Sequence, residues 1–553
     1  MTQKRSKGSI AFSSGVKLLL CAFFICAVIL PLISMLVHLK DADIGAVLSG
    51  ENCRISILHS LAVSLCATAV SVVIAGIAAY CMTRTSIRLK WAFSLLILLP
   101  MLIPSISHGM GLIIILGSNG TLTRFFGMTS GLYGFWGIVI GSVMYAFPVA
   151  YLMIADILKY EDSTPYEAAA VLGIPPLRRF TQITLPYLRR PMISVIFATF
   201  TLIVTDYGVP LMIGGMYKTL PVLIYEEVIG QQNFSDGSVY GLILLIPAVI
   251  AFIIDLVSKG DRRSLSILRP FEPSCKKRVK ALSYTALTII SVCVLYPIIS
   301  FTRLAFTKNY PVNPTFTLDN VASTFRKGGD TYLLNSVIIA LCVAVVGVVI
   351  SFVCAYMTAR APGRGSGFLH LMSILSLAIP GIVLGLSYVT FFSGSFIYGT
   401  LAILIMANTV HFFSSPYLMI YNSMEKLNPN LESVGSTLGI GRLRMIRDVI
   451  IPQTRSTLIE MFSYFFVNSM MTISAVAFLS NIKTKPISLM IPQFEAQMLL
   501  EASAFVSLLI LAINLAMKGI VYILRRMSLH QRSRGKNFDR KATNTTYADK
   551  ETV

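Results

Sequence analysis

Few residues in this chain have the types and spacing that chemistry requires. Its nine cysteines form no CxxC pair, and His108 and His411 stand apart from the carboxylates or cysteines that would complete a metal site. The phosphate-binding pattern G-x-x-x-x-G-K-[ST] does not occur. We therefore expect no enzymatic reaction, no metal site and no bound cofactor in this chain, so any use of ATP and Mg would depend on a partner.

Polar side chains inside long apolar runs are stronger candidates, because an ionisable group costs about 3 kcal/mol or more in the middle of a membrane-spanning helix and usually has a function there. Asp206 ends such a run just before a glycine and a proline. Either it caps the start of the next helix or it lines a path across the membrane. The prolines before Ser107 and His108 free backbone carbonyls that either line this path or accompany a kink in a packed helix. The candidate path residues are Thr205, Asp206, Tyr207, Ser107, His108, Thr472 and Ser474.

A short motif that occurs twice is the second kind of candidate. Residues 167–172 favour a helix, and Gly173 can end it because glycine adopts the left-handed conformation. A second, basic helix over 177–183 would follow, giving a helix-turn-helix that lies parallel to the membrane surface and that a partner can grip. One copy alone would fit an amphipathic interfacial helix, whereas two matched copies favour a paired docking site. The motif residues are Glu167, Ala168, Ala169, Gly173, Leu185 and Pro186 in the first copy, and Glu432, Gly435, Gly439 and Pro452 in the second.

The composition shows what kind of molecule must position these residues. Of 553 residues, 55% are apolar and only 13% are charged, about half the charged share of a soluble protein. This excludes an ordinary soluble enzyme and a disordered chain, and it favours an all-α polytopic membrane protein. The net charge of +21 fits basic loops on the cytoplasmic side better than nucleic-acid binding, because no basic stretch alternates with base-stacking aromatics.

Twelve apolar runs are long enough to span a bilayer, and an uncleaved N-terminal helix is the first of them. Basic and non-basic loops alternate along the chain, so the positive-inside rule places both termini in the cytoplasm. The predicted spans cover residues 18–37, 57–81, 91–116, 134–158, 192–214, 239–257, 282–303, 332–358, 367–392, 398–422, 456–480 and 502–524.

The two motif copies belong to a repeat of the whole bundle. The spacing from Gly173 to Gly439, which we call the motif offset, is the same as that from Pro186 to Pro452, whereas the spacing from Pro104 to Pro380, the proline offset, is longer. The first copy therefore carries about ten extra residues, placed most simply within 117–133. Six spans per half make the two repeats parallel. We divide the chain into a first repeat (1–257), a basic cytoplasmic linker (258–281), a second repeat (282–525) and a disordered cytoplasmic tail (526–553).

At the two motifs the sequence resembles the permease subunits of ABC importers. The first copy has their Glu-Ala-Ala, then Gly173, then Ile-x-Leu-Pro ending at Pro186, at every expected spacing. The second copy has Ser433, Val434 and Gly435 in place of Glu-Ala-Ala, with Glu432 one residue early. The resemblance implies a type I permease fold in a bacterial plasma membrane. It also implies that residues 166–176 and 432–442 are coupling helices that dock two copies of an ATPase subunit, and that an extracytoplasmic binding protein delivers the solute.

Within that class the chain looks most like the fused double permeases of ferric-iron and 2-aminoethylphosphonate importers. The residues that suggest this lie over 205–210, 213–215 and 472–476. Thiamine and polyamine systems belong to the same broad class and remain open. An ion-coupled secondary transporter would need several carboxylates within the membrane, and Asp156 and Asp206 are the only obvious ones. The duplicated motif argues against that alternative and against a membrane scaffold without transport.

Overall fold

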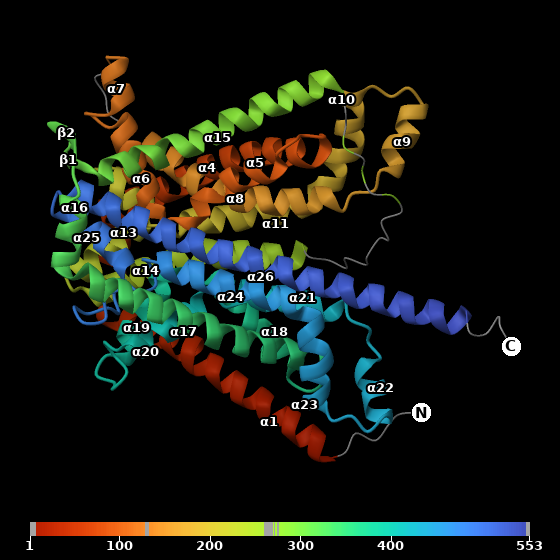
Figure 1. Cartoon of the computed structure of the whole chain (residues 1–553). Coiled ribbons are helices and arrows are strands. Elements are labelled where there is room, and N and C mark those ends of the chain that lie inside the picture. The colour runs from red at the N-terminus through yellow and green to blue at the C-terminus, as the bar shows by residue number, and fades with distance from the viewer. Residues whose placement is uncertain are drawn as a thin grey trace.

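The computed structural model describes residues 7–127, 132–258, 269, 271, 273 and 276–548, with side chains described between 13 and 527. Most of these residues are helical (Figure 1), which confirms the predicted all-α class. The helices of the first half are α1 (Lys7–Phe24), α2 (Leu30–Val37), α3 (Ile44–Ser49), α4 (Glu51–Arg84), α5 (Lys90–Leu98), α6 (Ser105–Leu116), α7 (Thr121–Phe125), α8 (Phe135–Lys159), α9 (Thr164–Val171), α10 (Pro176–Arg179), α11 (Leu185–Val204), α12 (Gly208–Ile213), α13 (Leu220–Tyr225) and α14 (Phe234–Ser258).

The second half repeats this order and adds one antiparallel hairpin, in which Thr307 pairs with Phe316 and Asn309 with Asn313. Its elements are α15 (Lys277–Ala305), β1 (Thr307–Asn309), β2 (Asn313–Phe316), α16 (Asp319–Thr324), α17 (Asp330–Ala355), α18 (Ser366–Leu375), α19 (Gly381–Phe392), α20 (Leu401–His411), α21 (Ser414–Glu425), α22 (Leu431–Thr437), α23 (Arg442–Met445), α24 (Ile451–Met471), α25 (Met490–Ala496) and α26 (Leu500–Ala548).

Short 3₁₀ and π-helical turns extend or join several of these helices. The 3₁₀ turns are His38–Asp41, Leu99–Leu102, Ser376–Ala378 and Ile487–Leu489, and the π-helical turns are Ile25–Ile29, Phe180–Thr184, Glu226–Gly230, Phe325–Gly329, Tyr356–Arg360 and Ile446–Ile450.

The described helices supply eight spans that are long and apolar enough to cross a membrane, and up to eleven if each bent pair counts as one span. Each of these overlaps a predicted span. The twelfth prediction, 456–480, is wrong in its last part, because α24 ends at Met471 and the following residues form turns. Helix α24 also does not reach the required apolarity, because polar residues such as Arg455 and Glu460 interrupt it. Helix α24 nevertheless packs against α17, α21 and α26 within the bundle.

Two of the bent pairs occupy matching positions in the halves. Helices α5 and α6 meet at 104° around Pro100 and Pro104, and α18 and α19 meet at 108° around Pro380. Proline lacks an N–H donor and clashes with the preceding turn, so a continuous helix is disfavoured at both breaks. The third span of each half is therefore a pair of half-helices, more sharply bent than a kinked helix.

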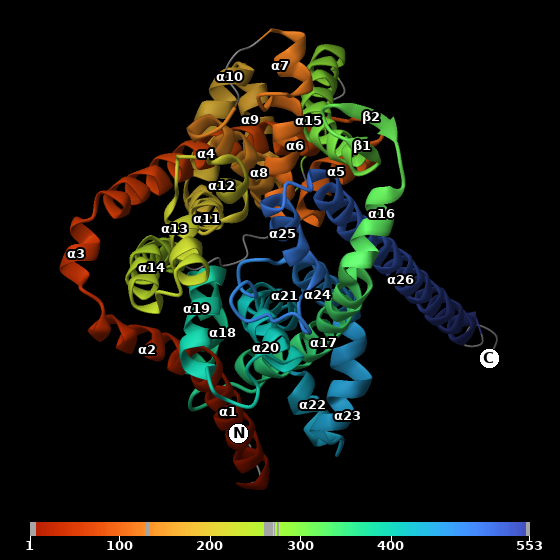
Figure 2. The ribbon, with the colours of Figure 1, turned by 90° about the vertical axis from the view of Figure 1, so that its left-hand side faces the viewer.

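The halves are interleaved through their first helices. Helix α1 packs on α18 and α2 on α19, while α15 packs on α4, α5 and α6. Lys17 Nζ donates to the Ala361 carbonyl at 2.9 Å and to Ser366 Oγ at 2.7 Å, which fixes α1 to the second half. In the reciprocal contact, the Arg88 backbone N–H donates to Tyr284 Oη at 2.8 Å. Figure 2 shows α1 and α2 beside α18 and α19, and α15 beside α5 and α6.

Both copies of the motif lie at the same end of the molecule. In Figure 1, α9 and α10 project at the upper right and α22 and α23 at the lower right, on the side where α1 begins and α26 ends. The opposite end carries α7, which falls in the predicted insertion at 117–133, and the β1–β2 hairpin. Parallel repeats require this arrangement, because corresponding loops then emerge on one side.

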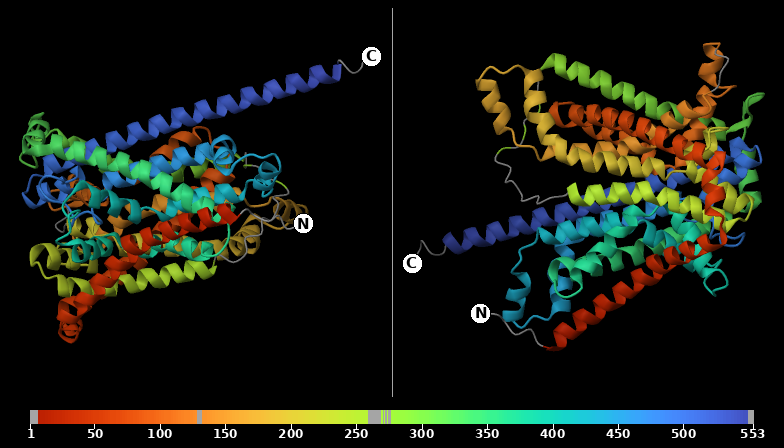
Figure 3. Two further views of the ribbon diagram at one scale, coloured as in Figure 1. Left: turned by 90° about the horizontal axis from the view of Figure 1, so that it is seen from below. Right: turned by 180° about the vertical axis from the view of Figure 1, so that it is seen from behind.

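The predicted linker 258–281 lies largely outside the described residues. Helix α26 continues well past the bundle (Figure 3) to Ala548, through most of the segment for which the sequence predicts a disordered tail. A helix that is already formed extends at one hydrogen bond per added residue, which explains how it can continue into a polar segment. Residues 549–553 lie outside the described part.

Candidate functional site

The first motif loop is built around α9. Proline at the start of the helix and an alanine run favour its formation, and Gly173 follows it at φ +69°. The Glu167 side chain is 54% exposed, accepts a hydrogen bond from Ser163 Oγ at 2.8 Å and pairs with Arg269 Nη1 at 3.1 Å. Ala169 is buried, whereas Ala168 faces outward.

The second helix of this loop differs from the prediction. Helix α10, the π-helical turn Phe180–Thr184 and α11 form one continuous span from Pro176 to Val204, so no separate surface helix ends at Leu185-Pro186. In the π-turn, the Leu185 N–H donates a hydrogen bond to the Phe180 carbonyl. The next residue, Pro186, has no N–H to donate. This wide turn lets proline enter the helix without breaking it.

The second motif loop repeats this design. Helix α22 is followed by Gly439 at φ +68°, and α23 continues through the π-turn Ile446–Ile450 into α24, whose first turn contains Pro452. A Cβ at Gly435 on α22 would meet the flexible end of the Met445 side chain on α23, so a larger residue there requires only that this end moves.

A buried arginine anchors the first loop to the second span. Arg84, the last residue of α4, forms an ion pair with Glu161 in which both side chains are buried. Tyr166 Oη on α9 donates to Glu161 Oε1 at 2.5 Å, and burial raises the pKa of Tyr166, which keeps the hydroxyl protonated as a donor. The Arg84 guanidinium also lies 3.8 Å from the centre of the Phe271 ring. The sequence analysis missed this group.

An equivalent arginine anchors the second loop. Arg360 follows Arg84 at the proline offset, the spacing that also relates the prolines of the broken spans. Its Nε and Nη2 donate to the two carboxylate oxygens of Glu432 at 2.8 and 2.5 Å, and Nη1 and Nη2 also donate to the carbonyls of Leu427 and Asn428. We call these two groups the first clamp (Arg84–Glu161) and the second clamp (Arg360–Glu432).

Exposed leucines occupy matched positions on the two loops. Leu172 is 75% exposed and its counterpart Leu438 is 70% exposed; Leu177 and Leu443 are 77% and 78% exposed. The two members of each pair are related by the motif offset. Apolar side chains repeated at the exposed tips of two loops indicate a surface for another protein.

A cavity of about 80 Å³ lies between the halves. Four predicted path residues, Asp206, Tyr207, Thr472 and Ser474, line it. Asp206 also caps α12, since its carboxylate accepts hydrogen bonds from the backbone N–H groups of Gly208 at 3.3 Å and Val209 at 3.1 Å. Both alternatives considered for this residue are thus compatible with its position. The full lining is Ile103, Pro104, Ser105, Tyr145, Asp206, Tyr207, His411, Phe412, Asn468, Met471, Thr472, Ile473 and Ser474.

The other three predicted path residues are not in this lining. Thr205 donates to the Thr201 carbonyl at 2.8 Å, and Ser107 Oγ donates to Ser507 Oγ on α26 at 2.8 Å. His108 is buried, and neither of its ring nitrogens has a hydrogen-bond partner among the described residues. These side chains belong to the packed interior around the cavity.

The lining residues are related by the repeat. Tyr145 and His411 occupy equivalent positions, as do Asp206 and Thr472, at the motif offset. A Cβ at Gly208 would collide with Ser105 Oγ, and a Cβ at Gly381 would collide with Ser474 Oγ, so a serine faces a glycine once in each half with the roles exchanged. The motif offset could have identified His411 as the partner of Tyr145 from the sequence.

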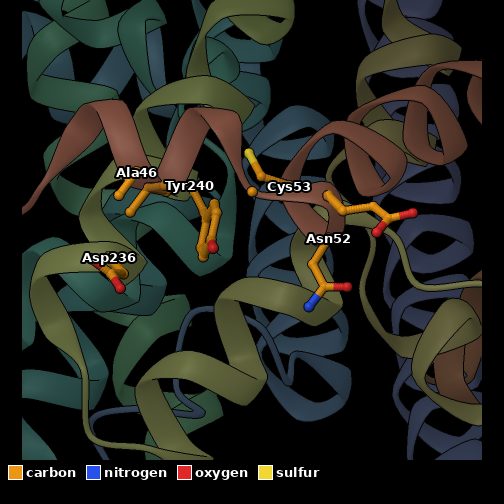
Figure 4. Close-up of a pocket in the computed structure, with 8 residues that line it drawn as sticks. Ala46, Asn52, Cys53, Asp236 and Tyr240 are labelled. Atoms are coloured by element: carbon orange, nitrogen blue, oxygen red, sulfur yellow. The ribbon is translucent and has the colours of Figure 1, made fainter.

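A second, open pocket of about 430 Å³ lies at the edge of the first half (Figure 4). It is formed by the α3–α4 corner and by Asp236 and Tyr240 of α14, and Asp236 accepts a hydrogen bond from Asn233 Nδ2 at 2.8 Å. The described part of the second half contributes nothing to this lining. Across the described residues, no group of three or more His, Cys, Asp or Glu side chains could hold a metal ion.

Comparison with known proteins identifies one family, which matches the chain in both halves. The family described as "Binding-protein-dependent transport system inner membrane component" matches the chain twice, over residues 71–260 and 347–528. The starts of these two matches are related by the proline offset, and one match falls mostly in each half of the chain, so the duplication is confirmed.

Several relatives match across both halves. A putative ferric transport system permease protein of Haemophilus influenzae is 26% identical over 73% of this chain and 66% of its own length. A ferric transport system permease protein of Actinobacillus pleuropneumoniae is 25% identical over 73% and 61%. An Fe(3+)-transport system permease protein of Haemophilus influenzae is 21% identical over 78% and 82%. The chain spans just under two thirds of the length of the first two.

Proposed function

The chain belongs to the family of binding-protein-dependent transport system inner membrane components, and from this premise we propose that it is the translocating permease of an ATP-driven importer for ferric iron. It catalyses no reaction itself. Two copies of an ATPase subunit, which bind ATP and Mg, dock on the two motif loops, and an extracytoplasmic binding protein delivers the solute to the opposite end.

The observation that carries this proposal is the pair of matched loops at one end of the bundle. Each presents a helix ended by a left-handed glycine, two exposed leucines and an arginine clamp to the second span of its half. A force applied to α9 or α22 by a partner is transmitted through the clamp to α4 or to the helix that ends at Arg360. Both motif loops must move together for the halves to rock against each other.

The proposed orientation follows from the same loops. They and both chain ends lie in the cytoplasm of a bacterial cell, as the alternation of basic loops predicts. The repeats 1–257 and 282–525 are then the two permease units, joined on the cytoplasmic side by 258–281. Lipid surrounds the long helices, whose outer faces carry exposed apolar residues such as Leu58, Leu65 and Ile289.

Ferric iron is the proposed solute because three relatives that match both halves are named for it. The cavity lining favours the same choice over 2-aminoethylphosphonate. A phosphonate group is bound best by arginine, lysine or free backbone N–H groups, and neither of these side chains is among the described residues that line the cavity. The N–H groups at the start of α12 already donate to Asp206.

Docking can be tested by changing Leu172→Asp and Leu438→Asp, singly and together. Burying a carboxylate in an apolar contact costs several kcal/mol, so each single variant should lower co-purification of the ATPase at least tenfold and the double variant should abolish it. Phe396→Asp is the control, since Phe396 is 92% exposed in the loop between α19 and α20, which lies away from both motif loops. ATPase binding and solute uptake that survive in the double variant would refute the proposal.

An ion-coupled carrier makes the opposite prediction. Vesicles that contain only this chain, without nucleotide, would then accumulate the solute from an ion gradient alone. We expect no accumulation until the ATPase, the binding protein and ATP are added.

A further inference from the structure

We infer that two residues of the linker between the repeats, Arg269 and Phe271, hold the first motif loop in the shape that its partner binds. We call this pair the strap. The inference rests on the proposed function, and it gives a positioning role to a segment that the sequence analysis treats only as a connection between the repeats. It also makes the first docking site dependent on the linker and the second docking site independent of it.

Arg269 is bound to the residues that lead into α9 and to the first turn of that helix. The Ser163 N–H donates to the Arg269 carbonyl at 3.1 Å, and the Arg269 N–H donates to Asp162 Oδ1 at 3.2 Å. The guanidinium adds the ion pair with Glu167 at 3.1 Å, which contributes little by itself because both side chains are exposed. The two backbone hydrogen bonds run in opposite directions, so they fix the position of Arg269 along the loop.

Phe271 covers the first clamp. The centre of its ring lies 3.8 Å from the guanidinium carbon of Arg84 and 5.2 Å from the centre of the Tyr166 ring, which it meets edge to face at 88°. A cation over an aromatic face gains more where water is excluded, and the Arg84 side chain is only 5% exposed. Because Arg84 ends α4 and Tyr166 lies on α9, this single ring joins the motif helix to the second span.

The second clamp is completed by its own loop instead. Arg360 donates to both carboxylate oxygens of Glu432 and to two backbone carbonyls of the segment that leads into α22. In the first clamp, Arg84 pairs with Glu161 and lies against the Phe271 ring, so a residue from outside the loop takes the place of those carbonyls. We therefore expect loss of the strap to affect α9 and to leave α22 unchanged.

A docked strap would raise the affinity of the first loop for the ATPase subunit by ordering it beforehand. Helix α9 has only eight residues, and helices of this length are marginal in water without tertiary contacts. A loop that is already ordered loses less conformational entropy when a partner binds, so more of the contact energy appears as affinity. The strap is thus a positioning device, and its loss should weaken docking without removing the docking surface.

The test measures the affinity of the purified ATPase subunit for the full-length chain in lipid nanodiscs, with one docking site available at a time. Leu438→Asp leaves only the first loop, and Leu172→Asp leaves only the second. Added to Leu438→Asp, Phe271→Leu should lower the affinity roughly fivefold, because it removes the aromatic face from Arg84, and Phe271→Tyr should keep the affinity. Added to Leu172→Asp, Phe271→Leu should change nothing.

Hydrogen exchange in the chain without the ATPase subunit separates positioning from a general loss of stability. Phe271→Leu should speed the exchange of the α9 amides and leave that of the α22 amides unchanged. Phe396→Leu is the matched control, since it makes the same substitution at a 92% exposed side chain away from both motif loops, and it should change neither. Arg269→Ala keeps both backbone hydrogen bonds and should speed exchange in α9 less than Phe271→Leu does.

Three results would overturn the role of the strap. These are an equal loss of ATPase affinity in both leucine backgrounds, no loss in the Leu438→Asp background, and exchange in α9 that Phe271→Leu leaves unchanged. All three would leave the proposed function intact, because Leu172→Asp and Leu438→Asp test it without changing the linker. Unchanged ATPase binding in those two variants would instead refute the proposed function and, with it, this role of the strap.

Discussion

The two motif loops share an anchoring arginine but differ in the position of the carboxylate that it holds. In the first loop, Arg84 binds Glu161, which precedes α9, and this leaves Glu167 on the exposed face. In the second loop, Arg360 binds Glu432 on α22 itself, and Ser433 occupies the position of Glu167. Glu432 looks like a displaced member of the motif in the second copy. It pairs with the anchoring arginine of its loop, as Glu161 does in the first loop.

This difference shows which features of the anchoring are common to both loops. The arginines remain at equivalent positions, and the loops remain anchored to the same spans, although the anchoring carboxylates do not occupy equivalent positions in the register of the repeat. The exposed carboxylate of Glu167 has no counterpart at the equivalent position of the second loop, which is Ser433. We infer that anchoring is required in both halves, whereas an acidic surface is required in only one.

The largest expected effect is loss of a clamp. Arg84→Ala leaves the Glu161 carboxylate, 3% exposed, without its partner, which should lower the free energy of unfolding by about 3–5 kcal/mol. Arg360→Ala should cost less, because the Glu432 side chain is 23% exposed and water can solvate it. Thermal unfolding in detergent would measure both.

A matched control for the clamps is Arg444→Ala, which breaks an exposed pair with Asp448 and should change stability by at most about 1 kcal/mol. Adding Glu161→Gln to Arg84→Ala should recover part of the loss, since it removes the stranded charge. Equal losses in Arg84→Ala and Arg444→Ala would mean that the first clamp does not stabilise the loop.

The next effect should be the same in both halves. Gly173 and Gly439 have φ values of +69° and +68°, and a Cβ at either position would meet nothing within 4 Å. Substitution with alanine should therefore lower the free energy of unfolding only by the penalty for holding alanine in the left-handed conformation, about 1–2 kcal/mol in each loop. The measurement is again thermal unfolding, combined with ATPase co-purification. A markedly unequal loss would show that one loop contains a contact absent from the other.

The sequence predicts most of this architecture because long apolar runs and the motif and proline offsets do not depend on packing details. It locates both motif loops and four of the thirteen residues that line the cavity. The sharp breaks at Pro104 and Pro380 follow from proline chemistry, but their angles depend on the helices packed around them. The continuation of α10 into α11 depends on a π-turn, for which the sequence gives no clear signal.

The features that sequence reasoning missed are contacts between distant segments. Lys17 on α1 reaches Ala361 and Ser366 in the opposite half of the chain, and apolar periodicity does not encode such a partner. The clamps are different, because Arg84 and Arg360 are aligned by the same offset as the prolines. Comparing charged residues across the repeat would have identified them, although not which glutamate each one binds.

A smaller effect is expected at the exposed carboxylate of the first loop. Glu167→Gln weakens an ion pair whose side chains are 54% and 71% exposed, so stability should change by about 0–1 kcal/mol. Ser433→Glu would give the second loop an exposed carboxylate at the equivalent position. If the acidic surface serves only the first docking site, Glu167→Gln should reduce ATPase binding, and Ser433→Glu should not increase it. A gain in Ser433→Glu would instead show that the two docking sites are interchangeable.

The smallest expected difference lies in a turn that precedes each motif helix. Asp162 Oδ1 accepts the Thr164 N–H at 3.1 Å, and at the equivalent position Asn428 Oδ1 accepts the Asn430 N–H at 2.9 Å. Hydrogen bonds from the Thr164 backbone and hydroxyl, together with Arg269, lower the pKa of Asp162. A lowered pKa in the folded state means that the turn gains stability above the unfolded pKa of about 4 and loses it as the pH falls through the folded value.

Hydrogen exchange, corrected for the intrinsic rate at each pH, should therefore show that protection of the Thr164 amide falls on acidification while protection of the Asn430 amide falls less. Both loops also contain a clamp glutamate, so Asp162→Asn is the decisive comparison, because it removes only the carboxylate of the turn. This variant should make the first turn behave like the second. If the Thr164 amide still loses protection in Asp162→Asn, the pH dependence originates in the clamp, and the two turns are equivalent despite their different side chains.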